Sequence, residues 1–170
     1  MQLTHNQHKF STRQFYIDLL CHEVRSPNNL GSIFRIAESF GIRHIYLTPD
    51  CPDPLNKTIK KISRHTTTTV PFSYCPSSIE LLKKAKEENT KCIALEITSL
   101  SQNLATYNFK EEAEQMPILI VIGSESNGVD DAVLTECPTH LHIEMFGLNS
   151  SMNVANSLAI CLYQITTQLV

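Results

Sequence analysis

The run Ile118-Leu119-Ile120-Val121-Ile122 is followed directly by Gly123-Ser124-Glu125-Ser126-Asn127-Gly128. Consecutive aliphatic residues without polar alternation are typical of a parallel strand that is buried on both faces. Such strands occur almost only in sheets whose two faces are both covered by helices. The run therefore predicts an α/β protein with residues 118–122 as a central strand.

Outward from this run, short apolar segments alternate with segments of helical periodicity. The predicted strands are 16–24, 44–48, 70–72, 91–97, 118–122 and 141–145. The predicted helices are 30–40, 57–66, 79–89, 129–137 and 153–170, and residues 99–115 are expected to be irregular. This alternation predicts a single doubly wound, mostly parallel α/β sheet.

Three local signals mark helix ends. Asn28 and Asn29 offer side-chain caps at the start of the first predicted helix. Gly41 stands where a left-handed residue would end that helix. The series Ser77-Ser78-Ile79-Glu80 has the spacing of a capping box.

The composition is that of one folded domain. A chain of 170 residues with 42% hydrophobic and 18% charged residues can bury one substantial core. No apolar run has membrane-spanning length, and residues 1–13 lack the apolar core of a signal peptide. We expect a cytoplasmic protein with a single domain over residues 1–170, in which residues 1–14 are flexible.

The cysteine pattern indicates neither disulfides nor a metal site. No Cys-x-x-Cys pair occurs, and no histidines cluster beside the cysteines. Reduced, mostly buried thiols are therefore expected, and no metal is predicted. The six are Cys21, Cys51, Cys75, Cys92, Cys137 and Cys161.

Ligands of open parallel sheets bind beyond the carboxyl ends of the strands, which directs attention to the loops after residues 24, 122 and 145. The first loop, 26–35, feeds a strand into a helix start whose free N–H groups favour an anion or a polar ligand edge. Arg35 lies off the apolar stripe of that helix. Two interpretations stay open: the loop binds a ligand, or its asparagines only cap the helix and Arg35 pairs with Glu38.

The second loop, 123–128, places two glycines and a carboxylate after the most apolar strand. Glycine lets a ligand approach the backbone closely. Glu125 is suited to orient a neighbouring loop or to accept from a ligand hydroxyl, and a plain glycine turn is the equally weighted alternative. The usual nucleotide fingerprints, G-x-G-x-x-G and the P-loop, are absent.

The third loop, 143–157, crowds small polar side chains at the entry to a long apolar helix. One serine or asparagine would be enough to cap that helix. The excess favours hydrogen bonding to a ligand or to another loop.

Taken together, the three loops resemble the motifs of the SpoU (TrmH-type) family of the SPOUT methyltransferases, from Tyr16 to the end of the chain. The first motif, N-x-G-x-x-x-R, is Asn29, Gly31 and Arg35. The second, G-x-E-x-x-G, is Gly123, Glu125 and Gly128. The third, I-P-M-x-G followed by S-L/M-N, is Ile143, Met145, Gly147, Ser151, Met152 and Asn153.

The resemblance implies an S-adenosylmethionine-dependent RNA (ribose-2′-O)-methyltransferase. It implies a C-terminal deep trefoil knot, which general topology rules would not predict. It also implies a homodimer in which the partner's first loop completes each active site. The expected cofactor-binding residues are Leu95, Gly123, Ile143, Met145, Gly147, Ser151 and Met152.

The same resemblance implies a catalytic set. Arg35 would lie at the target ribose, and because a guanidinium is a poor base we expect it to orient the RNA and stabilise the developing oxyanion. Asn29 and Glu125 would hold the loop geometry, while Ser151 and Asn153 would bond the cofactor or the ribose. One departure is Glu144, which stands where the family usually has a proline that would restrict the backbone.

RNA is the partner that the resemblance implies, although the net charge of −3 gives no bulk support for it. The basic residues Lys57, Lys60, Lys61 and Arg64 are candidate phosphate contacts, or else one solvated helix face. A compact chain without a separate RNA-binding domain favours tRNA over rRNA as the substrate. The alternatives are an rRNA enzyme, a SPOUT-like protein that binds RNA without methylating it, and a base or protein methyltransferase.

Overall fold

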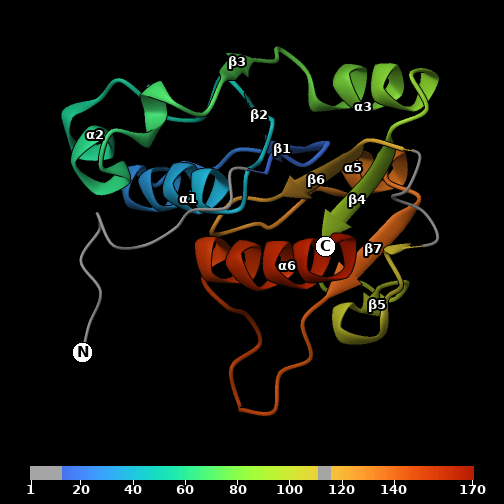
Figure 1. Ribbon diagram of the computed structural model, residues 1–170. Helices are drawn as coiled ribbons and strands as arrows, with labels where there is room; N and C mark the ends of the chain where they lie inside the picture. Colours follow the sequence, from blue (N-terminus) through green and yellow to red (C-terminus); the bar gives the residue numbers. More distant parts are fainter. Residues whose placement is uncertain (1–12, 111–115) are drawn as a thin grey trace.

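Seven strands form one parallel sheet within residues 13–110 and 116–170, which are the residues that this computed structural model describes (Figure 1). Their order is β3-β2-β1-β6-β4-β7-β5, and each neighbouring pair runs parallel. The strands are β1 (Ile17–Cys21), β2 (His44–Leu47), β3 (Phe72–Tyr74), β4 (Lys91–Leu95), β5 (Gln102–Asn103), β6 (Ile118–Ile122) and β7 (Thr139–His142).

Helices cover both faces of this sheet. On one face α1 and α6 pack together and α2 packs on α1, while α3 and α5 pack together on the other. The helices are α1 (Pro27–Ser39), α2 (Lys57–Ser63), α3 (Ser78–Glu87), α5 (Asp131–Glu136) and α6 (Val154–Leu169), with short 3-10 turns η2 (Thr66–Thr68) and η3 (Leu104–Thr106). The predicted doubly wound α/β sheet is confirmed, and the trefoil knot stays a prediction.

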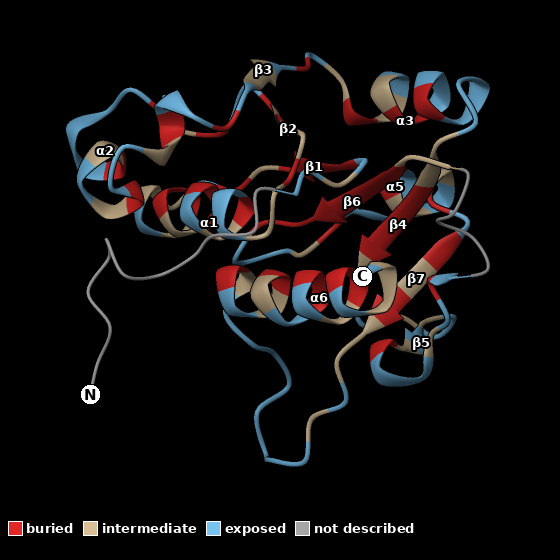
Figure 2. Cartoon of the chain, in the orientation of Figure 1, coloured by how far each residue is buried: buried red, intermediate tan, exposed pale blue. Residues whose placement is uncertain are grey.

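β6 is the central strand that the sequence predicts. It lies between β1 and β4, and all of its residues are buried (Figure 2). Ile120 packs into the core under α1 and α6, whereas Leu119 and Val121 pack into the core under α3 and α5. Each such buried aliphatic side chain stabilises the fold by roughly 1.5–3 kcal/mol relative to exposure.

Five strands differ from the prediction: β1 and β4 end earlier than expected, at Cys21 and Leu95, and three others differ in place. β3 begins after Pro71 rather than at Val70, since proline has no N–H to donate to the sheet. β7 covers residues 139–142, and the chain leaves the sheet before the apolar Ile143 and Met145 that suggested a later strand. The two-residue β5 lies in the segment expected to be irregular. Residues 111–115 of that segment, and residues 1–12 of the segment expected to be flexible, lie outside the described residues.

The helix ends follow the sequence signals with one change. Gly41 has a φ of +63° just after α1, as its position predicted. Ser77 caps α3 by accepting from the N–H of Glu80 at 3.3 Å. At the start of α1, however, the cap is Ser26, which accepts from the N–H of Asn29 at 3.3 Å. The side chain of Asn29 is therefore left for other contacts.

All six cysteines are buried and unpaired, as expected. Burial raises the pKa of Cys161 to about 12 and the pKa of Cys92 to about 11, so these thiols stay protonated at neutral pH. Across residues 13–110 and 116–170, no three His, Cys, Asp or Glu side chains are grouped to hold a metal ion. In the same ranges, no helix combines the length and apolar character that spanning a membrane would require.

Gly31 fixes the close contact between α1 and α2. A Cβ added at Gly31 would lie 2.9 Å from the Cβ of Ile62 and 3.3 Å from the carbonyl oxygen of Ile59. Neither neighbour is the end of a flexible side chain, so the two helices would have to move apart. The glycine of the first motif thus has a packing role.

We predict that Gly31→Ala lowers the free energy of unfolding by about 1–3 kcal/mol, because the added methyl overpacks the contact between α1 and α2. Urea unfolding monitored by circular dichroism measures this change. Ser39→Ala, on the exposed face of the same helix, is the control and should change stability little. A Gly31→Ala variant as stable as the wild type would contradict the steric argument.

Candidate functional site

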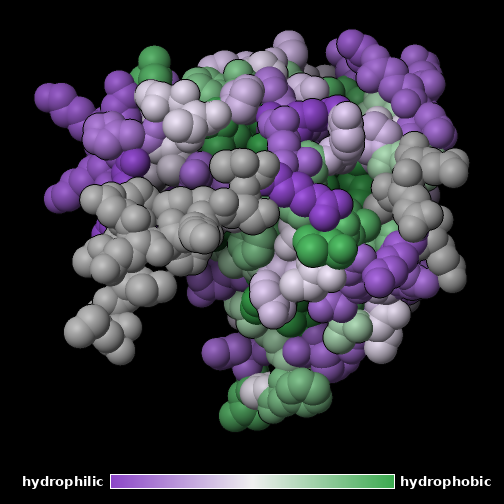
Figure 3. Space-filling view, in the orientation of Figure 1, coloured by the Kyte–Doolittle hydropathy of each residue, from purple (hydrophilic) through white to green (hydrophobic). Residues whose placement is uncertain are grey.

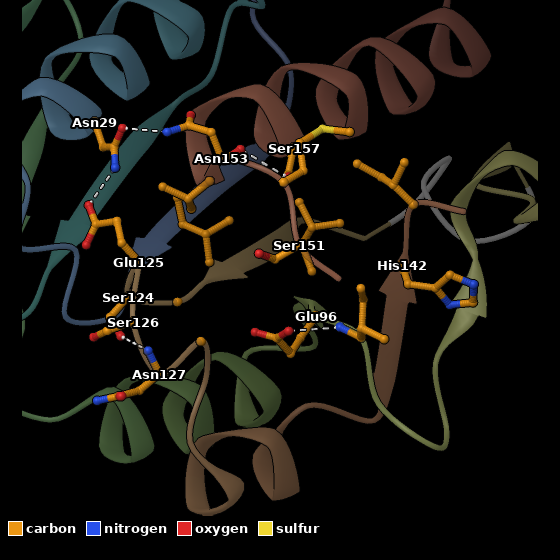
Figure 4. Close-up of a pocket in the computed structure, with 18 of the residues that line it drawn as sticks. Asn29, Glu96, Ser124, Glu125, Ser126, Asn127, His142, Ser151, Asn153 and Ser157 are labelled. Atoms are coloured by element: carbon orange, nitrogen blue, oxygen red, sulfur yellow. Dashed lines mark hydrogen bonds between the residues drawn. The ribbon is translucent and has the colours of Figure 1, made fainter. Parts of the chain in front are cut away.

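A cavity of about 580 Å³ opens at the carboxyl ends of β4, β6 and β7 (Figure 4). Its walls are the ends of these strands, the loop 123–128, the loop 143–153 and the start of α1. Nine residues predicted for the site line it: Asn29, Leu95, Gly123, Glu125, Ile143, Met145, Ser151, Met152 and Asn153. The three loops singled out in the sequence thus meet at one place.

A chain of hydrogen bonds connects the three loops. Asn29 donates from Nδ2 to Glu125 Oε1 at 2.8 Å, and its Oδ1 accepts from Asn153 Nδ2 at 2.9 Å. Figure 4 shows Asn29 between the other two side chains, with one bond on each side. An amide is suited to this place because it donates and accepts at the same time.

The carboxylate of Glu125 holds the start of the first loop. Besides the Asn29 amide, it accepts from the backbone N–H groups of Arg25 and Ser26, each at 3.2 Å. Burial raises the pKa of Glu125, but the hydrogen bonds from Asn29 and from the backbone outweigh burial, so the pKa lies below its ordinary value. Glu125 is therefore ionised at neutral pH and orients the neighbouring loop, which is one of the two roles proposed from its sequence.

Asn153 combines two functions. It is the N-cap of α6, because its Oδ1 accepts from the N–H groups of Ala155 at 3.1 Å and Asn156 at 3.3 Å. Its Nδ2 is left to bond Asn29. One side chain thus meets the capping need, and Ser151 of the same loop faces the cavity.

Two glycines close the second loop against itself. Ser124 and Gly128 exchange backbone hydrogen bonds of 3.0 Å in both directions. A Cβ at Gly123 would lie 2.1 Å from the carbonyl carbon of Gly128, which leaves no space for a side chain. Gly128 has a φ of +66°, a conformation that favours glycine. The tight turn exposes backbone at the cavity wall.

His22 holds the far end of the same loop. Its ring hydrogen-bonds Asp130 Oδ2 through Nε2 and Ser78 Oγ through Nδ1, both at 2.9 Å. Asp130 is the N-cap of α5, and the N–H of Val133 and the contact with His22 keep the pKa of this carboxyl below its ordinary value. The exit of the loop is thereby joined to the end of β1 and the start of α3.

Several pocket residues were not among the catalytic or cofactor-binding residues expected from the sequence, although Gly128 belongs to the second motif. They are Glu96, Ile97, Ile122, Ser124, Ser126, Asn127, Gly128, Leu141, His142, Val154 and Ser157. Glu96 is the informative one, since it follows the last residue of β4. The rule that ligands bind beyond the carboxyl ends of parallel strands applies to β4 as well as to the strands chosen. Extending this strand to Ile97 concealed the signal.

Other predicted residues lie outside the cavity lining. Arg35 is exposed on α1 and makes no ion pair among the described residues, so the alternative pair with Glu38 is not formed. Gly147 lies on the exposed part of the third loop, with no atom within 4 Å of an added Cβ. The basic residues 57–64 lie on and just after α2, beyond α1 (Figure 1).

Glu144, the departure from the family pattern, is exposed at the rim of the cavity. Its carboxylate lies 3.7 Å from Nε2 of His142, whose Nδ1 is 3.0 Å from Ser101 Oγ. The contact joins the third loop to the loop after β4. A proline at this position would provide no such partner for the histidine.

The cavity combines apolar surface with polar walls, which include the carboxylates of Glu96 and Glu125. Leu95, Ile122 and Ile143 supply apolar surface, while Ser151 and the backbone of the glycine loop supply hydrogen-bonding groups. Its volume lies within the roughly 300–1,000 Å³ that is usual for small-molecule sites. Such a lining suits a ligand with one flat apolar part and several polar edges.

We predict that Glu125→Gln lowers the free energy of unfolding by about 0.5–1.5 kcal/mol at pH 7, because an amide offers one acceptor where three donors converge. A lowered pKa means that the carboxylate stabilises the fold above its unfolded pKa of about 4.3 and loses this effect as the pH falls through the folded pKa. The difference should therefore shrink toward pH 3.5. Urea unfolding at both pH values measures it, with the exposed Glu38→Gln as control, and a pH-independent difference would refute the argument.

The comparisons with known proteins agree with this geometry. The model of the SpoU rRNA Methylase family matches residues 16–163. An uncharacterized tRNA/rRNA methyltransferase of Synechocystis is 30% identical over 153 residues, which are 89% of this chain and 53% of that protein. The 23S rRNA (guanosine-2′-O-)-methyltransferase RlmB of Nitrosomonas europaea is 27% identical over 146 residues, 86% of this chain and 54% of that protein.

Among solved structures, the SpoU methyltransferase AviRb from Streptomyces viridochromogenes in complex with the cofactor AdoMet has the same fold. Its TM-score is 0.78 at 23% identity, and the match covers 92% of this chain and 61% of that one. The chain spans about half the length of the curated relatives it matches. Because the family model covers most of the chain, this protein belongs to the SpoU rRNA Methylase family.

Proposed function

We propose that this chain transfers a methyl group from S-adenosylmethionine to a ribose 2′-hydroxyl of RNA, with tRNA favoured over rRNA. The observation that carries the proposal is the cavity at which residues of all three family motifs meet. Hydrogen bonds from Asn29 to Glu125 and from Asn153 to Asn29 join these motifs. The 2′-O activity named for RlmB supports the ribose as target. The family match to residues 16–163 supports a single catalytic domain over this range, for which we propose the cytoplasm as location.

The cavity fits the cofactor in volume and in chemistry. Its apolar floor of Leu95, Ile122 and Ile143 suits the faces of an adenine ring, and the close backbone of Gly123 suits its ribose. Met145, Ser151 and Met152 complete the set that we propose for cofactor binding. When bound, S-adenosylmethionine supplies an electrophilic methyl group on a sulfonium sulfur.

The residues of the chain have to hold the ribose oxygen in line with that methyl group and ease removal of its proton. Ser151 and Asn153 lie at the cavity and are suited to bond the ribose. The guanidinium of Arg35 offers a planar fork of donors, which suits an RNA phosphate and the developing oxyanion. We assign Asn29 and Glu125 to holding the loops.

The position of Arg35 favours a shared site. It is exposed on α1 and lies outside the cavity of its own chain. If Arg35 is catalytic, it has to act at the cavity of a second copy, which agrees with the homodimer expected from the family. The basic residues on α2, over which Figure 3 shows hydrophilic side chains, are the proposed contacts for RNA phosphates: Lys57, Lys60, Lys61 and Arg64.

We also infer the trefoil knot of the family for the C-terminal part of the chain. Two loops well separated in sequence, 123–128 and 143–153, line the same cavity, as a pocket built by a knot requires. The knot would lie between β6 and α6, the segment that contains both loops.

We predict that Arg35→Ala abolishes methylation, with a loss of at least about a hundredfold, but leaves the affinity for S-adenosylmethionine unchanged. Asn153→Ala should be inactive as well. If the site is shared, mixing the two inactive variants restores activity, since one cavity of each mixed dimer then has both residues intact. Methyl transfer to RNA and calorimetry with the cofactor measure these outcomes. Near-normal turnover of Arg35→Ala, or no recovery on mixing, would reject the corresponding assignment.

We predict that methylation needs a 2′-hydroxyl and prefers tRNA. Purified tRNA and rRNA fractions, each with a matched oligonucleotide carrying deoxyribose at the modified position, test both points with labelled S-adenosylmethionine. Label in rRNA alone would replace tRNA by rRNA as the substrate. Label retained on the deoxyribose oligonucleotide would indicate a base methyltransferase. RNA binding without label would favour a protein that binds RNA without modifying it.

A further inference from the structure

Glu96 stands where two cavities meet at the end of β4. It lines the candidate site and also a second cavity of about 800 Å³ that extends toward Leu134 and His140. Its backbone N–H donates to the carbonyl of Leu141 at 2.9 Å, which continues the pairing of β4 with β7. Figure 4 shows its side chain on a different wall of the site from Asn29 and Asn153. The main chain of Glu96 is thus fixed by the sheet.

The carboxylate of Glu96 forms a hydrogen bond at the end of the glycine loop 123–128. Oε2 accepts from the N–H of Val129 at 3.0 Å, and Oε1 accepts from the N–H of Ile97 at 2.9 Å. The side chain also packs against Gly128, where an added Cβ would lie only 2.4 Å from Oε2. The bare α-carbon of Gly128 and the carboxylate therefore fit each other.

Contacts within the turn connect the hydrogen bond of Glu96 to the cavity wall. Gly128 is bonded to Ser124 in both directions, and its carbonyl lies against the α-carbon of Gly123. A shift of Gly128 would therefore move Gly123, whose backbone faces the cavity. Glu125 holds the same loop from the opposite side through the first loop. The turn is clamped between two carboxylates from different elements.

We propose that Glu96 is a positioning residue that holds the loop 123–129 in the shape that receives the adenosyl part of the cofactor. This inference rests on the function proposed above. Because the turn is ordered before the ligand binds, the entropy lost on ordering it does not reduce the affinity for the cofactor. Glu96 acts through backbone groups and not on the methyl or the ribose oxygen, so it affects cofactor binding and leaves the rate of the chemical step unchanged.

Glu96→Ala should weaken binding of S-adenosylmethionine by roughly tenfold to a hundredfold, the range expected for a lost hydrogen bond to a charged group. The KM for the cofactor should rise in parallel, while kcat at saturating cofactor stays within about twofold. Glu96→Gln keeps one acceptor, so its affinity for the cofactor should lie between those of the wild type and Glu96→Ala. This second variant also covers the case in which the alanine variant folds poorly. Asp131→Asn, an acid-to-amide change at the second cavity, is the matched control and should behave as the wild type.

Amide hydrogen exchange of the free protein tests, without any ligand, whether Glu96 holds the loop 123–129. Peptides covering residues 123–129 should exchange faster in Glu96→Ala and Glu96→Gln than in the wild type and in Asp131→Asn. Unchanged exchange, or faster exchange with unchanged cofactor affinity, would overturn the positioning role. A fall in kcat with unchanged KM would overturn it too. A wild-type protein that binds no S-adenosylmethionine in calorimetry would instead overturn the proposed function, and with it the role assigned to Glu96.

Discussion

The chain leaves the central strand β6 through a gap that admits no side chain. A Cβ at Gly123 would lie 2.1 Å from the backbone of Gly128, so the loop has to turn back on itself as bare backbone. Because β6 is buried between β1 and β4, this turn lies at the middle of the carboxyl edge of the sheet. The neighbouring loops are built around it, and the cavity has exposed peptide groups at its centre.

Carboxylates keep the turn in place by accepting from backbone N–H groups. Glu125 accepts at the start of α1, Asp130 caps α5, and Glu96 accepts from Val129 between them. Against the effect of burial, the hydrogen bonds from the Asn29 amide and from the backbone lower the pKa of Glu125, and the N–H of Val133 at the start of α5 lowers the pKa of Asp130. The negative charges near this site thus serve the loop geometry. A net charge of −3 is for this reason compatible with the RNA binding that we propose for the basic residues on and just after α2.

How much the sequence could predict depended on how local the cause was. The run 118–122 and the caps Gly41 and Ser77 act through their own neighbours, and all were predicted correctly. The cap at α1 was misassigned because Ser26, Asn28 and Asn29 are all competent, and only the contact of Asn29 with Glu125 selects among them. β5 was missed because two residues carry no periodicity. The role of Glu96 could not be predicted, because it depends on a contact with Val129, which is far away in the chain.

The walls of the cavity differ in how firmly they are held. The glycine loop is held by Glu96 and Glu125, whereas the hydrogen bonds that hold the third loop to other described loops lie near its ends, from Asn153 to Asn29 and between His142 and Ser101. Between these ties Phe146 and Leu148 are 97% and 107% exposed. The free energy falls when a surface covers apolar side chains that are otherwise exposed to water. A wall held by two carboxylates thus faces a wall whose middle presents apolar side chains to water.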